Sequence, residues 1–194
     1  MEWEQMAEDT DQQLVDRVLG GNKNAFNLLV LRYQHRVAAL IGRFVHDHHE
    51  VEDVCQEAFI KAYRALPSFR GESAFYTWLY RIAVNTAKNH LVSRNRRPPA
   101  SDMDIDEAEV ADSGAVLREI EDPAGYLARD KLKQAITDAI DELPENLRTA
   151  FTLREFSGLS YEDITEVMEC PVGTVRSRIF RAREAIDKKI RDLL

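Results

Sequence analysis

The sequence predicts an all-α protein in which two small helical domains are joined by a flexible acidic linker. Three observations lead to this fold class. Apolar residues recur at the three- and four-residue spacing of helices, and never in alternating runs bounded by turns. Two prolines at positions 98 and 99 end the helical pattern. The stretch after them is acidic and has little apolar surface to bury. We therefore expect domains at residues 1–97 and 123–194, with the linker at 98–122.

The first domain is expected to contain four helices, separated by residues that interrupt a helix. These interruptions are Gly20-Gly21-Asn22, a polar break at residues 46–49, and Pro67. Ser73 has the short hydroxyl side chain that favours an N-cap. The expected helices cover residues 11–19, 25–45, 51–66 and 73–94.

The second domain is also expected to contain four helices. Pro123 suits the first turn of a helix, where its missing N–H costs nothing. Ser160 and Asp163 have the spacing of a capping box, and Thr174 follows a short turn that contains Pro171. The expected helices cover residues 123–143, 145–156, 160–168 and 174–191, with Ser160 and Thr174 as N-caps.

The net charge of −8 does not exclude a nucleic-acid partner, because the charge is unevenly distributed. Between Ser101 and Gly125 there are nine acidic side chains and one basic one, so this stretch alone accounts for the −8. The rest of the chain has 25 basic and 25 acidic side chains, and its basic residues gather at two places.

The sequence also indicates the compartment. No apolar run approaches the roughly 20 residues that span a bilayer, and residues 1–10 lack the basic start and apolar stretch of a signal peptide. We therefore expect a cytoplasmic protein. Cys55 and Cys170 lie far apart in the chain, and in a reducing compartment each is expected to remain a free, half-buried thiol.

The first basic surface belongs to a predicted helix-turn-helix over residues 157–186. Its second helix buries an apolar stripe, which leaves arginines on the opposite face. Such a helix fits the DNA major groove, where arginine can pair with guanine. The alternative is a solvated amphipathic helix at the chain end. We expect base contacts from Arg176, Ser177, Phe180 and Arg181, and phosphate contacts from Arg178 and Arg183.

The second basic surface covers residues 74–97, which contain five basic side chains and no acid. Aromatic rings crowd its start, and a loop with one large ring and a glycine precedes it. Basic groups beside aromatic rings suit single-stranded DNA, because charge holds the backbone and rings stack on bases. The alternative places Phe75 and Trp78 in the core. The expected DNA contacts are Phe69, Arg70, Trp78, Arg81, Asn85 and Lys88.

An acid-rich patch marks the start of the predicted helix at 51–66. Acids near a helix N-terminus are favoured by its dipole, so they can serve stability alone. They can equally form a docking surface for basic groups of a partner. Asp53, Gln56 and Glu57 are the candidates for such docking.

No pattern of catalytic residues is present. The sequence has no Gly-rich phosphate loop and no Ser/His/Asp arrangement, so we expect neither an enzyme nor a cofactor. His46, His48, His49 and Cys55 are potential metal ligands, but they are spread across a predicted break and a helix without a compact ligand pattern. We therefore expect no metal site.

Taken together, these segments resemble the extracytoplasmic-function group of bacterial RNA polymerase sigma factors, of the sigma-E type. Residues 53–59 (DVCQEAF) resemble the polymerase-binding helix of sigma region 2. Residues 69–83 (FRGESAFYTWLYRIA) resemble the part of region 2 that melts and reads the −10 element. Residues 158–183 resemble the helix-turn-helix of region 4, and the run at 96–99 (RRPP) is similar to the sigma-E type.

The resemblance implies more than the residues do alone. It implies that Asp53, Gln56 and Glu57 bind core RNA polymerase, that region 4 binds the −35 element of promoter DNA, and that the loop carrying Phe69 accepts a flipped −10 base while Asn85 contacts that element. It also implies control by a membrane-anchored anti-sigma factor in an envelope-stress response.

Two other classes of protein compete with this interpretation. An ordinary helix-turn-helix regulator with a helical sensor domain would explain residues 157–191, but neither the second basic surface nor the acidic patch. A helical adaptor that binds only protein would leave both basic surfaces unexplained.

Overall fold

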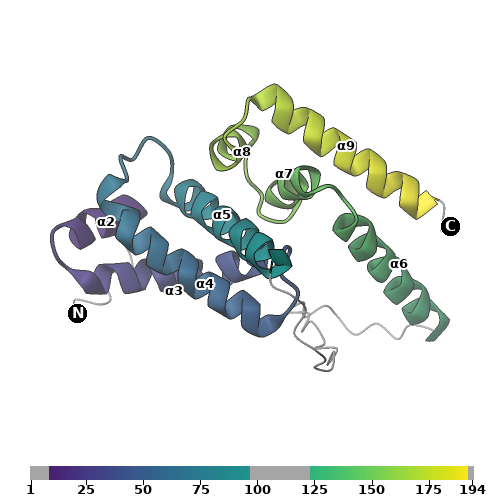
Figure 1. The fold of residues 1–194 in the computed structure, drawn as a ribbon, viewed down its shortest axis with the longest axis horizontal. Helices are drawn as coiled ribbons and strands as arrows, with labels where there is room; N and C mark the ends of the chain where they lie inside the picture. The colour runs from purple at the N-terminus through teal and green to yellow at the C-terminus, as the bar shows by residue number, and fades with distance from the viewer. Residues whose placement is uncertain (1–8, 97–122, 192–194) are drawn as a thin grey trace.

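The computed structural model describes residues 9–96 and 123–191, and every regular element within these ranges is helical. The helices form two lobes that lie side by side (Figure 1). The first lobe contains α2 (Asp11–Leu19), α3 (Lys23–Ile41), α4 (His48–Ala65), the 3₁₀ turn η1 (Leu66–Ser68) and α5 (Phe75–Arg96). The second contains α6 (Pro123–Asp141), α7 (Glu145–Glu155), α8 (Tyr161–Met168) and α9 (Val172–Arg191). The linker predicted at 98–122 lies outside the described residues.

The core of the first lobe forms where α3, α4 and α5 pack against one another, with α2 against α3. Leu29, Leu79 and Val54, one from each of the three packed helices, are 0 to 1% exposed. Burying a side chain of this size contributes about 1.5–3 kcal/mol. The buried stripes therefore fix which side of α4 and α5 remains available to partners.

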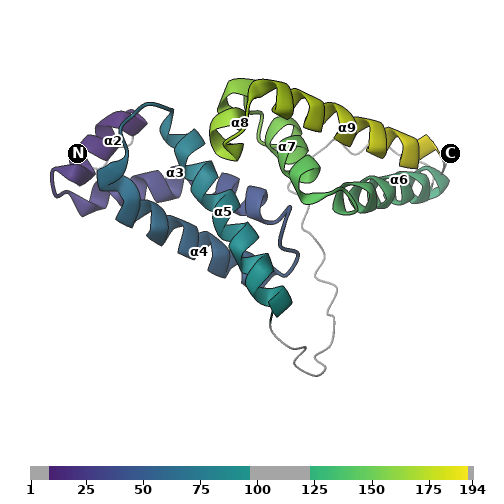
Figure 2. The same cartoon turned by 45° about the horizontal axis from the view of Figure 1, so that its top comes forward.

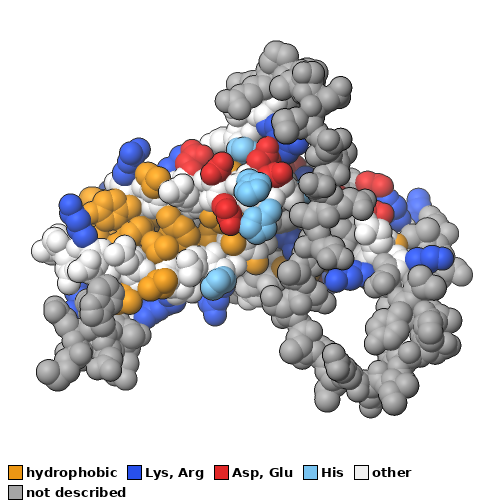
Figure 3. Space-filling view, turned by 90° about the horizontal axis from the view of Figure 1, so that it is seen from below, with side chains coloured by type: hydrophobic (Ala, Val, Ile, Leu, Met, Phe, Trp, Pro, Cys, Tyr) orange, Lys and Arg blue, Asp and Glu red, His pale blue; other side chains and the backbone are white. Residues whose placement is uncertain are grey.

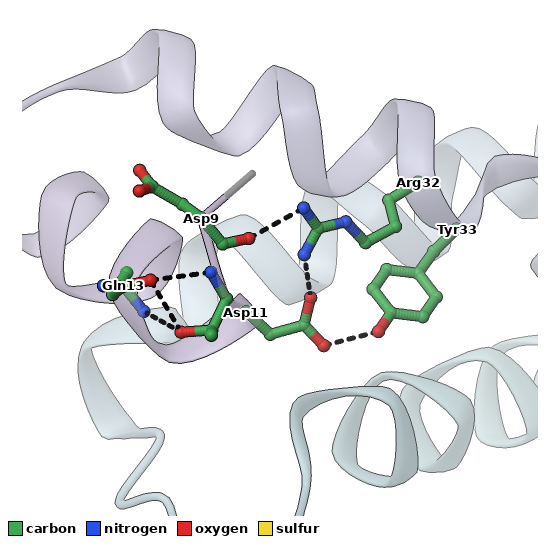
Figure 4. Close-up of polar contacts among 6 residues, drawn as sticks. Asp9, Asp11, Gln13, Arg32 and Tyr33 are labelled. Carbon is green, nitrogen blue, oxygen red and sulfur yellow. Dashed lines mark hydrogen bonds and ion pairs between the residues drawn. The ribbon is translucent and has the colours of Figure 1, made fainter. Parts of the chain in front are cut away.

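A polar network ties α2 to α3 (Figure 4). The Arg32 guanidinium donates to an Asp11 carboxylate oxygen at 2.6 Å and to the Asp9 carbonyl at 2.9 Å, and the Tyr33 hydroxyl donates to Asp11. Burial, followed by the hydrogen bond to Asp11, raises the pKa of Tyr33. Thr10 and Gln13 complete a capping box at the same helix end. The N-terminal helix is thus held by directed bonds as well as by apolar packing.

The second lobe packs α7 and α8 against α9, and α6 lies along the C-terminal half of α9 (Figure 2). Ala139, Ile140 and Leu143 contact Ala182 and Ile186 there, and each of the five is at most 6% exposed. The far side of α9 is left uncovered by the rest of this lobe.

Four helix starts differ from the sequence prediction by two or three residues, and the first is that of α3, which begins at Lys23 with Asn22 as its N-cap. Helix α4 begins at His48 because the Asp47 carboxylate caps it, accepting from the Glu50 N–H at 2.8 Å. Helix α9 begins at Val172, before Thr174, since the Pro171 carbonyl already accepts from the N–H groups of residues 174 and 175. Helix α5 begins at Phe75, and the carbonyl of residue 74 accepts its first bond, so Ser73 lies one position outside the cap.

The remaining boundaries differ from expectation by at most two residues, except the end of α3. Helix α2 has the predicted limits, and α7 and α8 differ by one residue at one end. Helix α3 ends at Ile41 instead of 45, and α6 ends at Asp141 instead of 143. Phe44 and Val45 are nevertheless buried, in the turn that follows α3. None of the helices within residues 9–96 and 123–191 is long and apolar enough to cross a membrane.

Candidate nucleic-acid interface

Helices α8 and α9 form the predicted helix-turn-helix. The Ser160 hydroxyl accepts from the Asp163 N–H at 3.0 Å, and the Asp163 carboxylate lies 3.3 Å from the Ser160 N–H, which completes the capping box. Helix α8 ends at Glu169, whose φ of 49° reverses the chain into the turn before α9. This local geometry aims α9 away from α8 and fixes its outer face.

The outer face of α9 matches the residues predicted to contact bases. Val175, Ile179, Ala182 and Ile186 form the buried stripe, at 0 to 6% exposed. Arg176, Ser177, Phe180 and Arg181 are all exposed, and Phe180 keeps 67% of its surface in solvent. A large ring this exposed beside two guanidinium groups gains little from the fold itself. The arrangement is therefore more useful for contact with a ligand than for stability.

The two arginines predicted to contact phosphates already have partners. Arg178 donates to the Cys170 thiol at 3.3 Å, which ties α9 to the turn. Arg183 forms an ion pair with Glu155 on α7, at 2.5 Å. Either guanidinium must share or release its partner to reach DNA.

The surface predicted on α5 is divided between core and solvent. Phe69, Phe75 and Trp78 form an aromatic cluster with ring centroids 5.1 to 5.9 Å apart. Phe75 is 4% exposed and Trp78 is 7% exposed, which agrees with the alternative that places both rings in the core. Trp78 therefore serves the core in this structure, and its contact with DNA remains a prediction that requires the loop to open.

The loop before α5 leaves other predicted contacts accessible. Phe69 is only half-buried at the edge of the cluster, and Arg70 is exposed beside it. Gly71 has a φ of +70°, which an L side chain rarely adopts, so the turn that presents Phe69 depends on a glycine. Asn85 is exposed on α5. This loop and Asn85 are the readily available part of the predicted single-strand surface.

The predicted docking residues lie on the same helix as the lining of an apolar groove, to which Gln56 itself contributes and which was not predicted from the sequence. Asp53, Gln56 and Glu57 are exposed on α4. A groove of about 620 Å³ lies between α3 and α4, and Figure 3 looks onto this face, where apolar side chains gather beside acidic and histidine side chains. Its lining includes Ile60, 44% exposed, and Tyr63, 38% exposed. The sequence signal for this groove was the three-residue spacing of Ile60 and Tyr63, which places both side chains beside the buried stripe of α4.

The family is decided by matches on both lobes. Residues 29–97 match the family model of sigma-70 region 2, and residues 133–186 match that of sigma-70 region 4. The chain belongs to the sigma-70 family of RNA polymerase sigma factors. The resemblance inferred from the motifs and the all-helical, two-domain fold are thereby confirmed.

Relatives place this sigma factor in the extracytoplasmic-function group. It is 63% identical over 189 residues to the RNA polymerase sigma-H factor of Pseudomonas aeruginosa, covering 97% of this chain and 98% of that one. It is also 63% identical over 185 residues to the ECF RNA polymerase sigma-E factor of Escherichia coli K12, covering 95% and 96%.

Two solved structures of complexes contain a chain that is similar to this one. The structure of CnrH in complex with the cytosolic domain of CnrY has a TM-score of 0.67 at 26% identity, covering 93% of this chain and 96% of CnrH. The sigma factor RpoE of Bartonella quintana, in complex with the anti-sigma factor NepR, has a TM-score of 0.62 at 28% identity, covering 86% and 96%. Both similarities extend over most of the chain.

In this sigma factor the two lobes contact each other through the predicted −10 surface. Arg81 lies 3.6 Å from a Glu169 carboxylate oxygen, and Lys88 lies 3.0 Å from one of Glu145. The second lobe thus supplies acids to two of the six side chains predicted to contact single-stranded DNA. To bind Arg81 and Lys88, DNA phosphates would have to displace Glu169 and Glu145 from these ion pairs.

Asp163 is the centre of the contact, and the sequence analysis assigned it only to the capping box. Its carboxylate accepts from the Tyr76 hydroxyl at 3.1 Å and the Thr77 hydroxyl at 2.9 Å. Burial raises the pKa of Asp163, but hydrogen bonds from Ser160, Thr77 and Tyr76 outweigh it and hold that pKa below its usual value. Asp163 therefore stays ionised at neutral pH and links α8 to α5.

Proposed function

We propose that this sigma factor binds core RNA polymerase through the first lobe and directs it to promoters by contacts with both DNA elements. In this proposal residues 1–97 form region 2, 98–122 the linker and 123–194 region 4. The exposed face of α9, which presents Arg176, Arg181 and Phe180 to solvent, is the observation that carries the DNA assignment. The chain supplies recognition, and the polymerase supplies the chemistry.

The division of labour follows from the groups on each surface. Arg176, Ser177, Phe180 and Arg181 would read −35 base edges, with Arg178 and Arg183 on phosphates. Phe69, Arg70, Trp78, Arg81, Asn85 and Lys88 would hold and open the −10 element. Asp53, Gln56 and Glu57, with the apolar groove beside them, would dock on core polymerase, where a groove adds apolar burial to charge complementarity.

We call the arrangement in which the two lobes are in contact the closed form. Because acids of the second lobe pair with Arg81 and Lys88 in it, the closed form would bind promoter DNA poorly. Docking on core polymerase would have to separate the lobes before both elements are read. An anti-sigma factor could act by holding them together. The B. quintana relative is bound to an anti-sigma factor, and we extend that mode of control to this chain, with a membrane-anchored inhibitor and an envelope-stress signal. Cytoplasmic location follows from the same partners.

The test is promoter binding in the presence and absence of core polymerase. The proposal predicts that a labelled duplex promoter fragment is retarded specifically by this protein only when core polymerase is present. Specific binding of equal strength by the protein alone would favour a simple helix-turn-helix regulator. Core polymerase alone, and a fragment with scrambled −35 and −10 elements, are the controls.

A further inference from the structure

We propose that His48, His49 and Glu52 form a surface site for a divalent transition metal ion such as Zn²⁺. One potential ligand atom from each residue lies within 4.8 Å of the other two. The His48 Nδ1 and a Glu52 carboxylate oxygen are 3.6 Å apart. In a tetrahedral site with metal–ligand bonds of about 2.0–2.1 Å, two ligands are separated by roughly 3.3 Å. The pair is thus close to a metal-binding separation before any ion is present.

The position of the helix start creates this cluster. Residues 46–49 were expected to be a break, and in a break these side chains have no fixed relation. With Asp47 as the N-cap, His48 and Glu52 lie four residues apart on the first turns of α4, where side chains of one face meet. His49 adds a third ligand from the next position. The cap bond fixes the backbone that carries all three.

Neighbouring acids do not compete for the same role. The Asp47 carboxylate is engaged by the Glu50 N–H, and the Glu50 carboxylate lies 2.8 Å from Arg94 and 3.4 Å from His90. In contrast, the His48 and Glu52 side chains are 72% and 66% exposed, so an ion can reach them from solvent. The structure therefore leaves the Glu52 carboxylate accessible beside the imidazoles of His48 and His49.

The donor set selects the class of metal. Two imidazole nitrogens and one carboxylate suit Zn²⁺, Ni²⁺ or Cu²⁺, whereas Mg²⁺ and Ca²⁺ prefer oxygen ligands throughout. Water would complete the coordination shell. Cys55 does not belong to the group of potential ligand atoms that lie within 4.8 Å of one another.

The site would lie within two turns of the proposed docking residues on the same helix. A bound dication next to Asp53 and Glu57 would offset the negative charge of the docking surface. Resting on the proposed function, this predicts that Zn²⁺ weakens association with core polymerase, and that the His48→Ala/His49→Ala variant loses this sensitivity. If Zn²⁺ weakens the association of that variant equally, the proposed link between this metal site and polymerase docking is wrong, because the ion would then act at another site.

The site itself is tested by calorimetric titration of ZnCl₂ into the full chain without a purification tag. We expect one ion per chain at this site, and an affinity at least about tenfold lower for His48→Ala and for Glu52→Gln. His35→Ala removes an exposed histidine from α3 and should bind as the wild type does. Equal affinity in His48→Ala and wild type, or no Zn²⁺ binding by the wild type, would overturn the proposal. Circular dichroism checks that each variant keeps its helices.

Discussion

The hydroxyl of Thr77, buried on α5, donates a hydrogen bond of 2.9 Å to the carboxylate of Asp163 on α8. The two residues are 86 positions apart in the chain. Their bond joins a helix of region 2 to the first helix of the helix-turn-helix, next to the predicted −10 surface. Any process that moves the lobes apart has to break it.

Replacing Thr77 by valine should loosen the closed form. The change keeps the shape but removes the donor, and a lost bond to a charged group costs about 1.5–3 kcal/mol. The radius of gyration from small-angle scattering should therefore increase relative to wild type. Thr152→Val is the matched control, because the Thr152 hydroxyl is buried without a hydrogen-bond partner in the described structure. If Thr77→Val leaves the radius unchanged, the bond does not hold the lobes.

The lobe contact should be insensitive to pH over the neutral range. Since hydrogen bonds depress the pKa of Asp163 in the closed form, its contribution is fully present above the ordinary aspartate pKa of about 3.9 and is lost as pH falls through the depressed value. Scattering curves at pH 8, 7 and 5 should superimpose. A change in the scattering curve between pH 8 and pH 5 would show that the lobe contact does not depend on Asp163 in this way.

Charge reversal at the docking surface should abolish association with core polymerase. Asp53→Arg with Glu57→Arg would place like charges against the partner, at a cost of several kcal/mol. Both side chains are exposed, so the fold should survive. The measurement is co-elution with core enzyme, and Asp16→Arg, an exposed reversal on α2, is the control. Full co-elution of the double variant would place the docking surface elsewhere.

Asn85→Ala and Phe69→Ala should impair open-complex formation more than initial promoter binding. Loss of a stacking ring costs about 1–3 kcal/mol, and Asn85 is exposed with no part in the core. A template already mismatched at the start site should largely restore activity. Asn24→Ala, an exposed change on α3, should behave as wild type. Equal defects on duplex and mismatched templates would contradict a role in opening.

Arg176→Ala and Arg181→Ala should each weaken promoter use in a base-specific way. A lost pair of bonds to guanine costs about 1–3 kcal/mol and relaxes preference at one position. Arg183→Ala should weaken all sequences evenly and lower the salt slope by about one unit. A panel of single-base −35 variants, transcribed at several salt concentrations, separates the two behaviours. Uniform losses for Arg176→Ala and Arg181→Ala would mean that the faces of α9 are assigned wrongly.

The sequence predicted local structure better than contacts between distant residues. The stripe of Val175, Ile179 and Ala182 is a periodic signal, so the faces of α9 could be assigned before its start was known. The start itself was missed because the carbonyl of Pro171 can open a helix without a side-chain cap. The partners of Asp163 were beyond reach, since nothing local marks two hydroxyls that come from 86 and 87 residues earlier in the chain.

Run-off transcription with purified core polymerase measures whether this protein directs the enzyme to a promoter. The template carries a promoter selected by binding to the complex of this protein with core polymerase. We expect a transcript of defined length only when both proteins are present, and we expect the Asp53→Arg/Glu57→Arg variant to lose it. The absence of any promoter-specific transcript with wild-type protein, or an undiminished one with that variant, would contradict it.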